Sequence, residues 1–196
     1  MSIISALDKM GLSIQIGIPA FIDRENYSWH FQVKPCDMKN SDSINEYYYN
    51  LGKIQALLYL LGAQDIIPDN LIVIGNCPYI IDCESVVSKK FKHLDSTKIS
   101  AYLQSSVLET GILPDWMFNG ANDRSQISSV LFEFDDSNFH LPKKEGKSYP
   151  ITAETLQDLE KGFTDACNFM RAHKLDLLSY IYSYDFNFMR SRVLLH

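Results

Sequence analysis

Three polar residues between positions 65 and 82 have the types and the spacing that phosphoryl transfer requires. Asn70 follows Asp65 by five positions, and Asp82 comes after a short segment that contains a turn signal. In a kinase catalytic loop, the Asp of D-x-x-x-x-N orients the attacking hydroxyl, while the Asn and a later Asp hold Mg²⁺ on ATP. Glu84 lies on the same side of an extended chain as Asp82. The pattern therefore predicts catalytic roles for Asp65, Asn70 and Asp82, with Asn70, Asp82 and Glu84 as metal ligands.

The same residues also allow a purely structural interpretation. Asp65 and Asp69 are common turn residues, Asn70 can start a strand, and Asp82 can end one. The D-x-x-x-x-N pattern alone often arises by chance. The kinase-like interpretation depends on the elements around the loop, which must bring the three side chains together.

A long helix is predicted before the loop. Ser43 and Glu46 have the spacing of a capping box, which satisfies free backbone N–H groups at a helix start. Gly62 suits the position just after a helix end. Together with the apolar spacing, these signals predict a helix over about 43–61. The apolar residues at helical spacing are Ile44, Tyr47, Tyr48, Leu51, Ile54, Leu58 and Leu61.

A β-hairpin is predicted after the loop. The β-rich runs LIVIG (71–75) and PYIID (78–82) flank a Gly-Asn turn signal. Pro78 has no N–H and is therefore restricted to a strand start or a sheet edge. Such a hairpin returns Asp82 towards the loop that carries Asp65.

The remaining segments are less informative. Residues 1–42 are poorly periodic and include an extended segment over 14–22. Residues 96–110 are predicted to be helical, residues 132–150 to form a surface loop, and residues 152–182 to form a second helical region. The predicted fold class is α+β, mostly helical, like a kinase C-lobe with a catalytic loop and a short β-hairpin.

Composition narrows the class of protein. The chain has 196 residues, of which 46% are hydrophobic, so it can bury a core and is not a disordered protein. A net charge of −6 argues against a broad nucleic-acid surface. The four cysteines include no C-x-x-C pair, and the longest apolar run, Ala56–Leu61, is far short of the roughly 20 residues of a membrane span. We therefore expect a cytoplasmic protein without a membrane span or a nucleic-acid partner.

The segment 47–85 resembles the dehydratase domain of class II lanthipeptide synthetases, the lantibiotic-modifying enzymes of the LanM type. That family has a Tyr-Tyr-containing ALLYLLG helix that leads to an Asp, an Asn five residues later, and a P-x-x-I-D-x-E segment. The resemblance continues through SSVLETGILPDW (105–116) and covers about residues 29–196. The matching residues are Tyr47, Tyr48, Gly52, Ala56–Gly62, Asp65, Asn70, Gly75, Pro78, Asp82 and Glu84.

The resemblance implies a fold, a reaction and cofactors. The family's domain resembles lipid kinases, phosphorylates Ser and Thr of a precursor peptide with ATP and Mg²⁺, and then eliminates the phosphate. By matching positions, Asp65 is the catalytic-loop Asp, and Asn70 and Asp82 bind metal and nucleotide. Arg192 matches the arginine used in phosphate elimination, where a guanidinium suits a leaving phosphate.

The sequence also departs from the family pattern. Ile67 stands where the family has His, Gln64 replaces a Thr, and His196 replaces the second Arg of the tail motif. Only 64 residues precede Asp65, and neither a glycine-rich phosphate loop nor a strand lysine is found. The expectation is a single partial dehydratase domain over 1–196 that is truncated, split or degenerate, with a separate chain supplying the N-lobe or the cyclase domain.

Two alternatives remain open. An aminoglycoside- or choline-kinase-like small-molecule phosphotransferase also combines D-x-x-x-x-N with an I-D-x-E segment, although it has no counterpart of SVLETGILP. A non-catalytic peptide-binding remnant would keep the fold without ATP chemistry, and Ile67 favours this second alternative.

Overall fold

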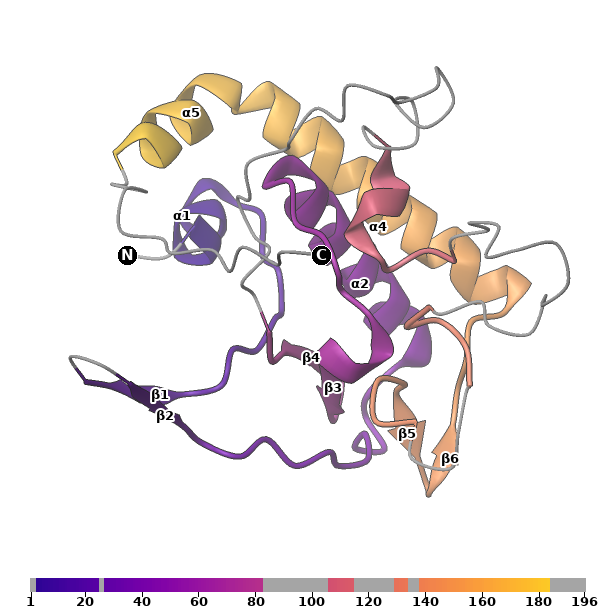
Figure 1. Cartoon of the computed structure of the whole chain (residues 1–196). Helices are drawn as coiled ribbons and strands as arrows, with labels where there is room; N and C mark the ends of the chain where they lie inside the picture. Colours follow the sequence, from indigo (N-terminus) through magenta and orange to yellow (C-terminus); the bar gives the residue numbers. More distant parts are fainter. Residues whose placement is uncertain (1–2, 25–26, 83–105, 115–128, 134–137, 184–196) are drawn as a thin grey trace, which may run out of the picture.

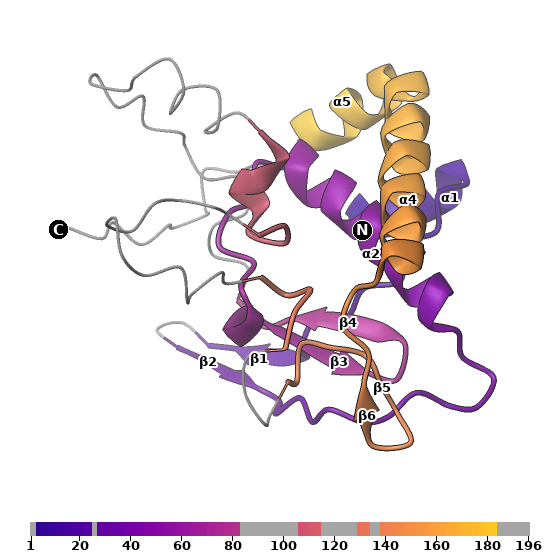
Figure 2. The same cartoon turned by 90° about the vertical axis from the view of Figure 1, so that its right-hand side faces the viewer.

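The structure, a computed structural model, describes residues 3–24, 27–82, 106–114, 129–133 and 138–183. The structure combines helices with strands that pair as short antiparallel hairpins, so the fold is α+β as predicted (Figures 1 and 2). The helices are α1 (Ile3–Met10), α2 (Ile44–Leu60), α4 (Ala153–Ala172) and α5 (Lys174–Tyr182), with 3₁₀ turns η1 (Pro68–Asn70) and η2 (Val107–Thr110). The strands are β1 (Phe21–Asp23), β2 (Ser28–His30), β3 (Leu71–Ile74), β4 (Cys77–Ile80), β5 (Lys143–Lys144) and β6 (Lys147–Ser148).

Helix α2 confirms the predicted helix and its ends. The Ser43 side chain accepts a hydrogen bond from the backbone N–H of Glu46 at 3.4 Å, as expected for an N-cap. At the other end, Leu61 is the C-cap and Gly62 adopts the left-handed conformation, with φ +65°. Most of α2 is buried, so this helix forms the centre of the hydrophobic core.

Helices α2 and α4 cross in close contact, and glycine makes the crossing possible (Figure 1). A Cβ atom at Gly52 would lie 2.0 Å from the carbonyl oxygen of Leu159, and one at Gly162 would lie 1.9 Å from that of Tyr49. Only glycine, which has no Cβ atom, allows the two helix backbones to come this close. The Tyr48 hydroxyl adds a hydrogen bond of 2.7 Å to the carbonyl oxygen of Tyr149, just before α4.

The hairpin β3–β4 confirms the second prediction. The pairing runs from Leu71 opposite Ile80 to Ile74 opposite Cys77, across a two-residue turn in which Gly75 has φ +61°. Pro78 lies within β4, and its carbonyl oxygen accepts a hydrogen bond from Gly17 on a neighbouring segment. The hairpin is therefore held in place by the chain that follows α1.

The predicted second helical region over 152–182 is confirmed and consists of two helices, α4 and α5. His173 has φ −101° and ψ 24°, which separates α4 from α5. The buried side of α4 is made by Leu159, Gly162, Ala166 and Met170, whereas Leu156 is 47% exposed.

Two other segments differ from expectation. Ser106 is extended, with ψ 167°, and caps the single 3₁₀ turn η2, so the helix predicted over 96–110 does not continue to its end; residues 96–105 lie outside the described residues. Where it is described, the region 132–150 holds the β5–β6 hairpin and a buried Leu141. Among the helices that the structure describes, none is long and apolar enough to cross a membrane.

Candidate functional site

The Asp65 loop begins directly after the end of α2. Asp65 is exposed and has φ +63°, a left-handed conformation that few residues other than glycine adopt. The Asn70 side-chain amide donates a hydrogen bond of 2.9 Å to the Asp65 carbonyl oxygen and closes the loop. The predicted D-x-x-x-x-N pair is therefore one hydrogen-bonded unit.

Asn70 also connects this loop to the hairpin. Its backbone N–H bonds to the carbonyl oxygen of Ile67 at 2.9 Å, which forms η1. Its own carbonyl oxygen accepts a hydrogen bond of 3.0 Å from Ile81. Asp82 is the next residue and is exposed, so the hairpin returns it beside the loop as the sequence predicted.

The turn η2 contacts the Asp65 loop and is hydrogen-bonded to its backbone. The N–H of Ile66, which is fully buried, bonds to the carbonyl oxygen of Thr110 at 3.0 Å. Gly111 has φ +82°, and a Cβ atom there would lie 2.9 Å from the nitrogen of Ile66. The buried Ser129 hydroxyl donates to the carbonyl oxygen of Ile112 at 2.7 Å and fixes the segment.

Sequence reasoning missed this positioning role. The sequence predicts the end of a helix at residue 110 and a family pattern over 105–116, and nothing in the composition of this segment indicates contact with a loop forty residues earlier. The available signal was Gly111, because a glycine after a short polar turn favours a positive φ and close backbone approach.

The other predicted site residues have different outcomes. Glu84 and Arg192 lie outside the described residues, so their predicted roles stay predictions. Ile67 is half-buried and precedes η1 in an extended conformation. Within the described ranges, no three His, Cys, Asp or Glu side chains converge as a metal cluster.

The donor chemistry of the loop fits a hard cation. Asn70 uses its side-chain nitrogen on Asp65, which leaves its amide oxygen for a metal ion. Amide and carboxylate oxygens are the ligands that Mg²⁺ prefers, and it is commonly held by one or two carboxylates together with phosphate oxygens. Asn70 and Asp82 are therefore suitable protein ligands.

Two titratable groups, one buried and one half-buried, lie near the turn end of the β3–β4 hairpin. Burial raises the pKa of the Cys77 thiol on β4. Burial, reinforced by Tyr48 and Cys77, raises the pKa of Tyr47 well above its usual value. Both groups therefore stay protonated at neutral pH, and the acidic side chains exposed in the loop and after the hairpin are Asp65, Asp69 and Asp82.

Comparison with known proteins defines the class of this chain. Residues 1–149 match the family described as "Domain of unknown function (DUF4135)", which occurs in lanthipeptide synthetases, and the chain belongs to this family. The chain is similar to "Lacticin 481/lactococcin biosynthesis protein LcnDR2" of Lactococcus lactis subsp. lactis, with 28% identity over 193 aligned residues. The alignment covers 82% of this chain and 21% of that protein, so the chain spans about a fifth of the relative's length. The predicted relationship to lanthipeptide synthetases is confirmed.

Proposed function

We propose that this chain carries the catalytic loop of a lanthipeptide-dehydratase activity. The reaction is phosphorylation of Ser or Thr in a precursor peptide, followed by elimination of the phosphate. The hydrogen bond between the Asn70 side chain and the Asp65 backbone is the observation that supports the proposal most strongly. It holds the two polar residues of the D-x-x-x-x-N pattern in one fixed unit, and the name of the Lactococcus relative supports a role in lantibiotic biosynthesis.

The proposed cofactors are ATP and Mg²⁺. Asn70 and Asp82 would hold the metal, with Glu84 as a further proposed ligand. When bound, Mg-ATP supplies the phosphoryl group and neutralises its charge. Groups outside this region, in the same protein or in a separate chain, would complete the nucleotide site and carry any cyclase activity.

The protein groups would act at defined atoms. The Asp65 carboxylate would orient the Ser or Thr hydroxyl and accept its proton, while the hydroxyl oxygen bonds to the γ-phosphorus and the bond from that phosphorus to ADP breaks. In the elimination step, a general base from the rest of the protein would accept the α-proton of the phosphorylated residue, a Cα=Cβ double bond would form, and the Cβ–O bond would break as phosphate leaves. Arg192 is proposed to stabilise that leaving phosphate, because a guanidinium binds phosphate oxygens in a bidentate manner.

Ile67 would make the reaction slow. A His at this position could hydrogen-bond a phosphate oxygen or share in proton transfer at neutral pH, whereas Ile can do neither. The loss of a positioned proton-transfer group typically costs on the order of 10²–10⁴ in rate. We therefore propose weak phosphorylation rather than the full activity of the family.

A chimera tests the proposal. Residues 1–196 replace the aligned region of the Lactococcus relative, and mass spectrometry follows a precursor peptide incubated with Mg-ATP. The expected result is a gain of phosphate followed by a loss of water, both slower than with the parent protein. If a folded chimera that still binds the peptide adds no phosphate, even with Ile67→His, the proposed activity is refuted and a non-catalytic peptide-binding role is favoured.

A further inference from the structure

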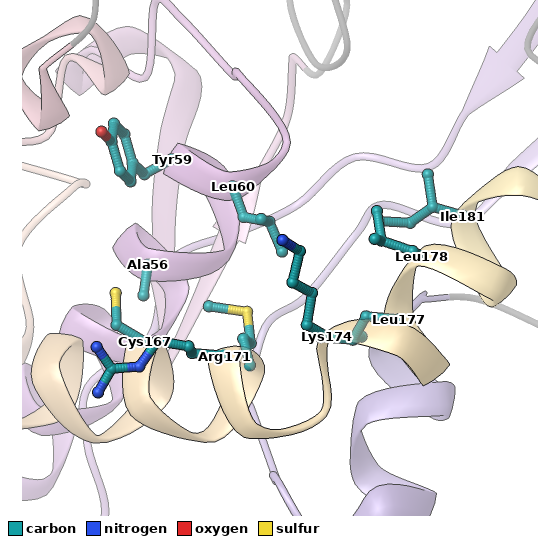
Figure 3. A pocket seen from close by; sticks show the side chains of 10 residues that line it. Ala56, Tyr59, Leu60, Cys167, Arg171, Lys174, Leu177, Leu178 and Ile181 are labelled. Carbon is teal, nitrogen blue, oxygen red and sulfur yellow. The ribbon is translucent and has the colours of Figure 1, made fainter.

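An apolar groove lies at the end of α2, away from the hydrogen bonds that hold the Asp65 loop. It has a volume of about 330 Å³ and is formed where α2, α4 and α5 meet (Figure 3). Tyr59 and Leu60, both on its rim, are 41% and 47% exposed, so the groove is open to solvent. Its apolar lining includes Tyr59, Leu60, Met170, Leu177, Leu178 and Ile181.

Both charged side chains that line the groove are basic. Lys174 extends from the start of α5 towards Leu60, whereas Arg171 lies beside Cys167 on α4 (Figure 3). One Arg171 nitrogen donates to Asn168 at 3.1 Å, which leaves further guanidinium donors. Among the described residues, no acidic side chain lines the groove, and nearby Asp176 lies 3.8 Å from the His173 ring instead.

We propose that this groove binds an acidic amphipathic peptide segment, with apolar side chains on its floor and carboxylates beside Arg171 and Lys174. The two basic side chains in the groove favour an acidic occupant. The whole chain has a net charge of −6 and would repel an acidic peptide elsewhere, so attraction requires a local group of basic residues such as Arg171 and Lys174. Apolar residues at helical spacing docked in a groove are an established mode of peptide recognition. Because the groove is open to solvent, it suits a peptide that inserts some of its side chains better than a small molecule that has to be enclosed.

The position of the groove relates this site to the catalytic loop. Leu60 and Asp65 are five residues apart, so their Cα atoms can be separated by at most about 18 Å. A segment anchored in the groove would therefore keep the rest of its peptide at high effective concentration near Asp65. The choice of a peptide as occupant rests on the proposed function, but its binding requires neither ATP nor phosphoryl transfer.

Binding can be measured with the full chain and a designed probe. The probe is a short fluorescein-labelled peptide with Leu at helical spacing and flanking Glu residues, and two matched peptides carry Gln or Lys in place of Glu. Fluorescence anisotropy without ATP should show the tightest binding for the Glu peptide, weakened by added salt because the rim charges are exposed. Lys174→Glu should weaken that binding by about three- to tenfold, whereas Lys161→Glu, an exposed control on α4, should leave it unchanged.

Two variants test the apolar floor. Ile181→Asp and Leu60→Asp should each weaken binding by more than about tenfold, since each places a carboxylate where an apolar side chain docks. Leu60 is half-exposed, so its variant should fold even if Ile181→Asp does not, and circular dichroism checks both.

Absence of Glu-peptide binding, equal binding of the Lys peptide, or insensitivity to Leu60→Asp overturns the proposal. If dodecanoate competes with the Glu peptide equally tightly, the groove binds a fatty acid instead. If sedimentation shows a dimer that Leu60→Asp dissociates, the groove is occupied by a second copy of the chain. Because no outcome involves phosphoryl transfer, failure here is distinguishable from failure of the proposed chemistry.

Discussion

The substitution Gly162→Ala tests the closest contact in the fold. The added methyl group would lie 1.9 Å from the Tyr49 carbonyl oxygen and 2.8 Å from its carbonyl carbon. These atoms belong to the backbone of a buried helix, so they cannot move aside as the end of a flexible side chain can. Overpacking of this severity costs up to roughly 3 kcal/mol, and the better helix propensity of alanine recovers roughly 1 kcal/mol.

The expected net loss is therefore about 2 kcal/mol, which lowers the Tm of a chain of this size by roughly 4–8 °C. Differential scanning calorimetry would measure the shift. Thr164→Ala, on an exposed position of the same helix, is the matched control and should raise Tm slightly. Gly146→Ala is a second control that introduces backbone strain without a steric clash. Gly146 has φ +75°, and no atom lies within 4 Å of a Cβ added there. A Gly162→Ala protein that melts at or above the wild-type temperature would refute the close α2–α4 crossing.

The remaining predictions concern a hydrogen bond, a thiol and the loop. Tyr48→Phe removes the bond to the Tyr149 carbonyl and should cost about 1 kcal/mol in urea denaturation; an unchanged midpoint would argue against that bond. Burial raises the pKa of Cys167 and the positive charge of Arg171 opposes this, so Arg171→Ala should raise that pKa further. The pH profile of iodoacetamide alkylation should then move to higher pH, because only the thiolate reacts; an unmoved profile would contradict the assignment. In the chimera, Ile67→His should increase peptide phosphorylation by up to roughly 10²-fold, and no gain would show that position 67 is not limiting.

The sequence predicted those elements whose signals are local. Ser43 and Gly62 mark the ends of α2 by capping chemistry, and the β3–β4 hairpin follows from two β-rich runs around Gly75 and Asn76. The break at His173 was not predicted, because apolar residues continue on both sides of it and no glycine or proline marks it.

The candidate site was only partly predictable for the same reason. The spacing of Asp65 and Asn70 indicated a common loop, and their hydrogen bond confirms it. The contact of Ile66 with Gly111 joins segments more than forty residues apart, so no local pattern reports it. The groove at the end of α2 likewise arises from three helices, and its residues looked like ordinary core positions in the sequence.

The most direct test of the proposed catalytic loop compares two carboxylates that are four residues apart. Asp65→Asn and Asp69→Asn each remove one exposed negative charge, and of the two residues it is Asp65 whose carbonyl oxygen accepts the hydrogen bond from the Asn70 side chain. Phosphate transfer from Mg-ATP to a precursor peptide is measured in the chimera that carries Ile67→His. The account predicts that Asp65→Asn lowers the rate by on the order of 10²-fold or more, while Asp69→Asn leaves it nearly unchanged. Equal rates for the two variants would contradict a catalytic role for Asp65.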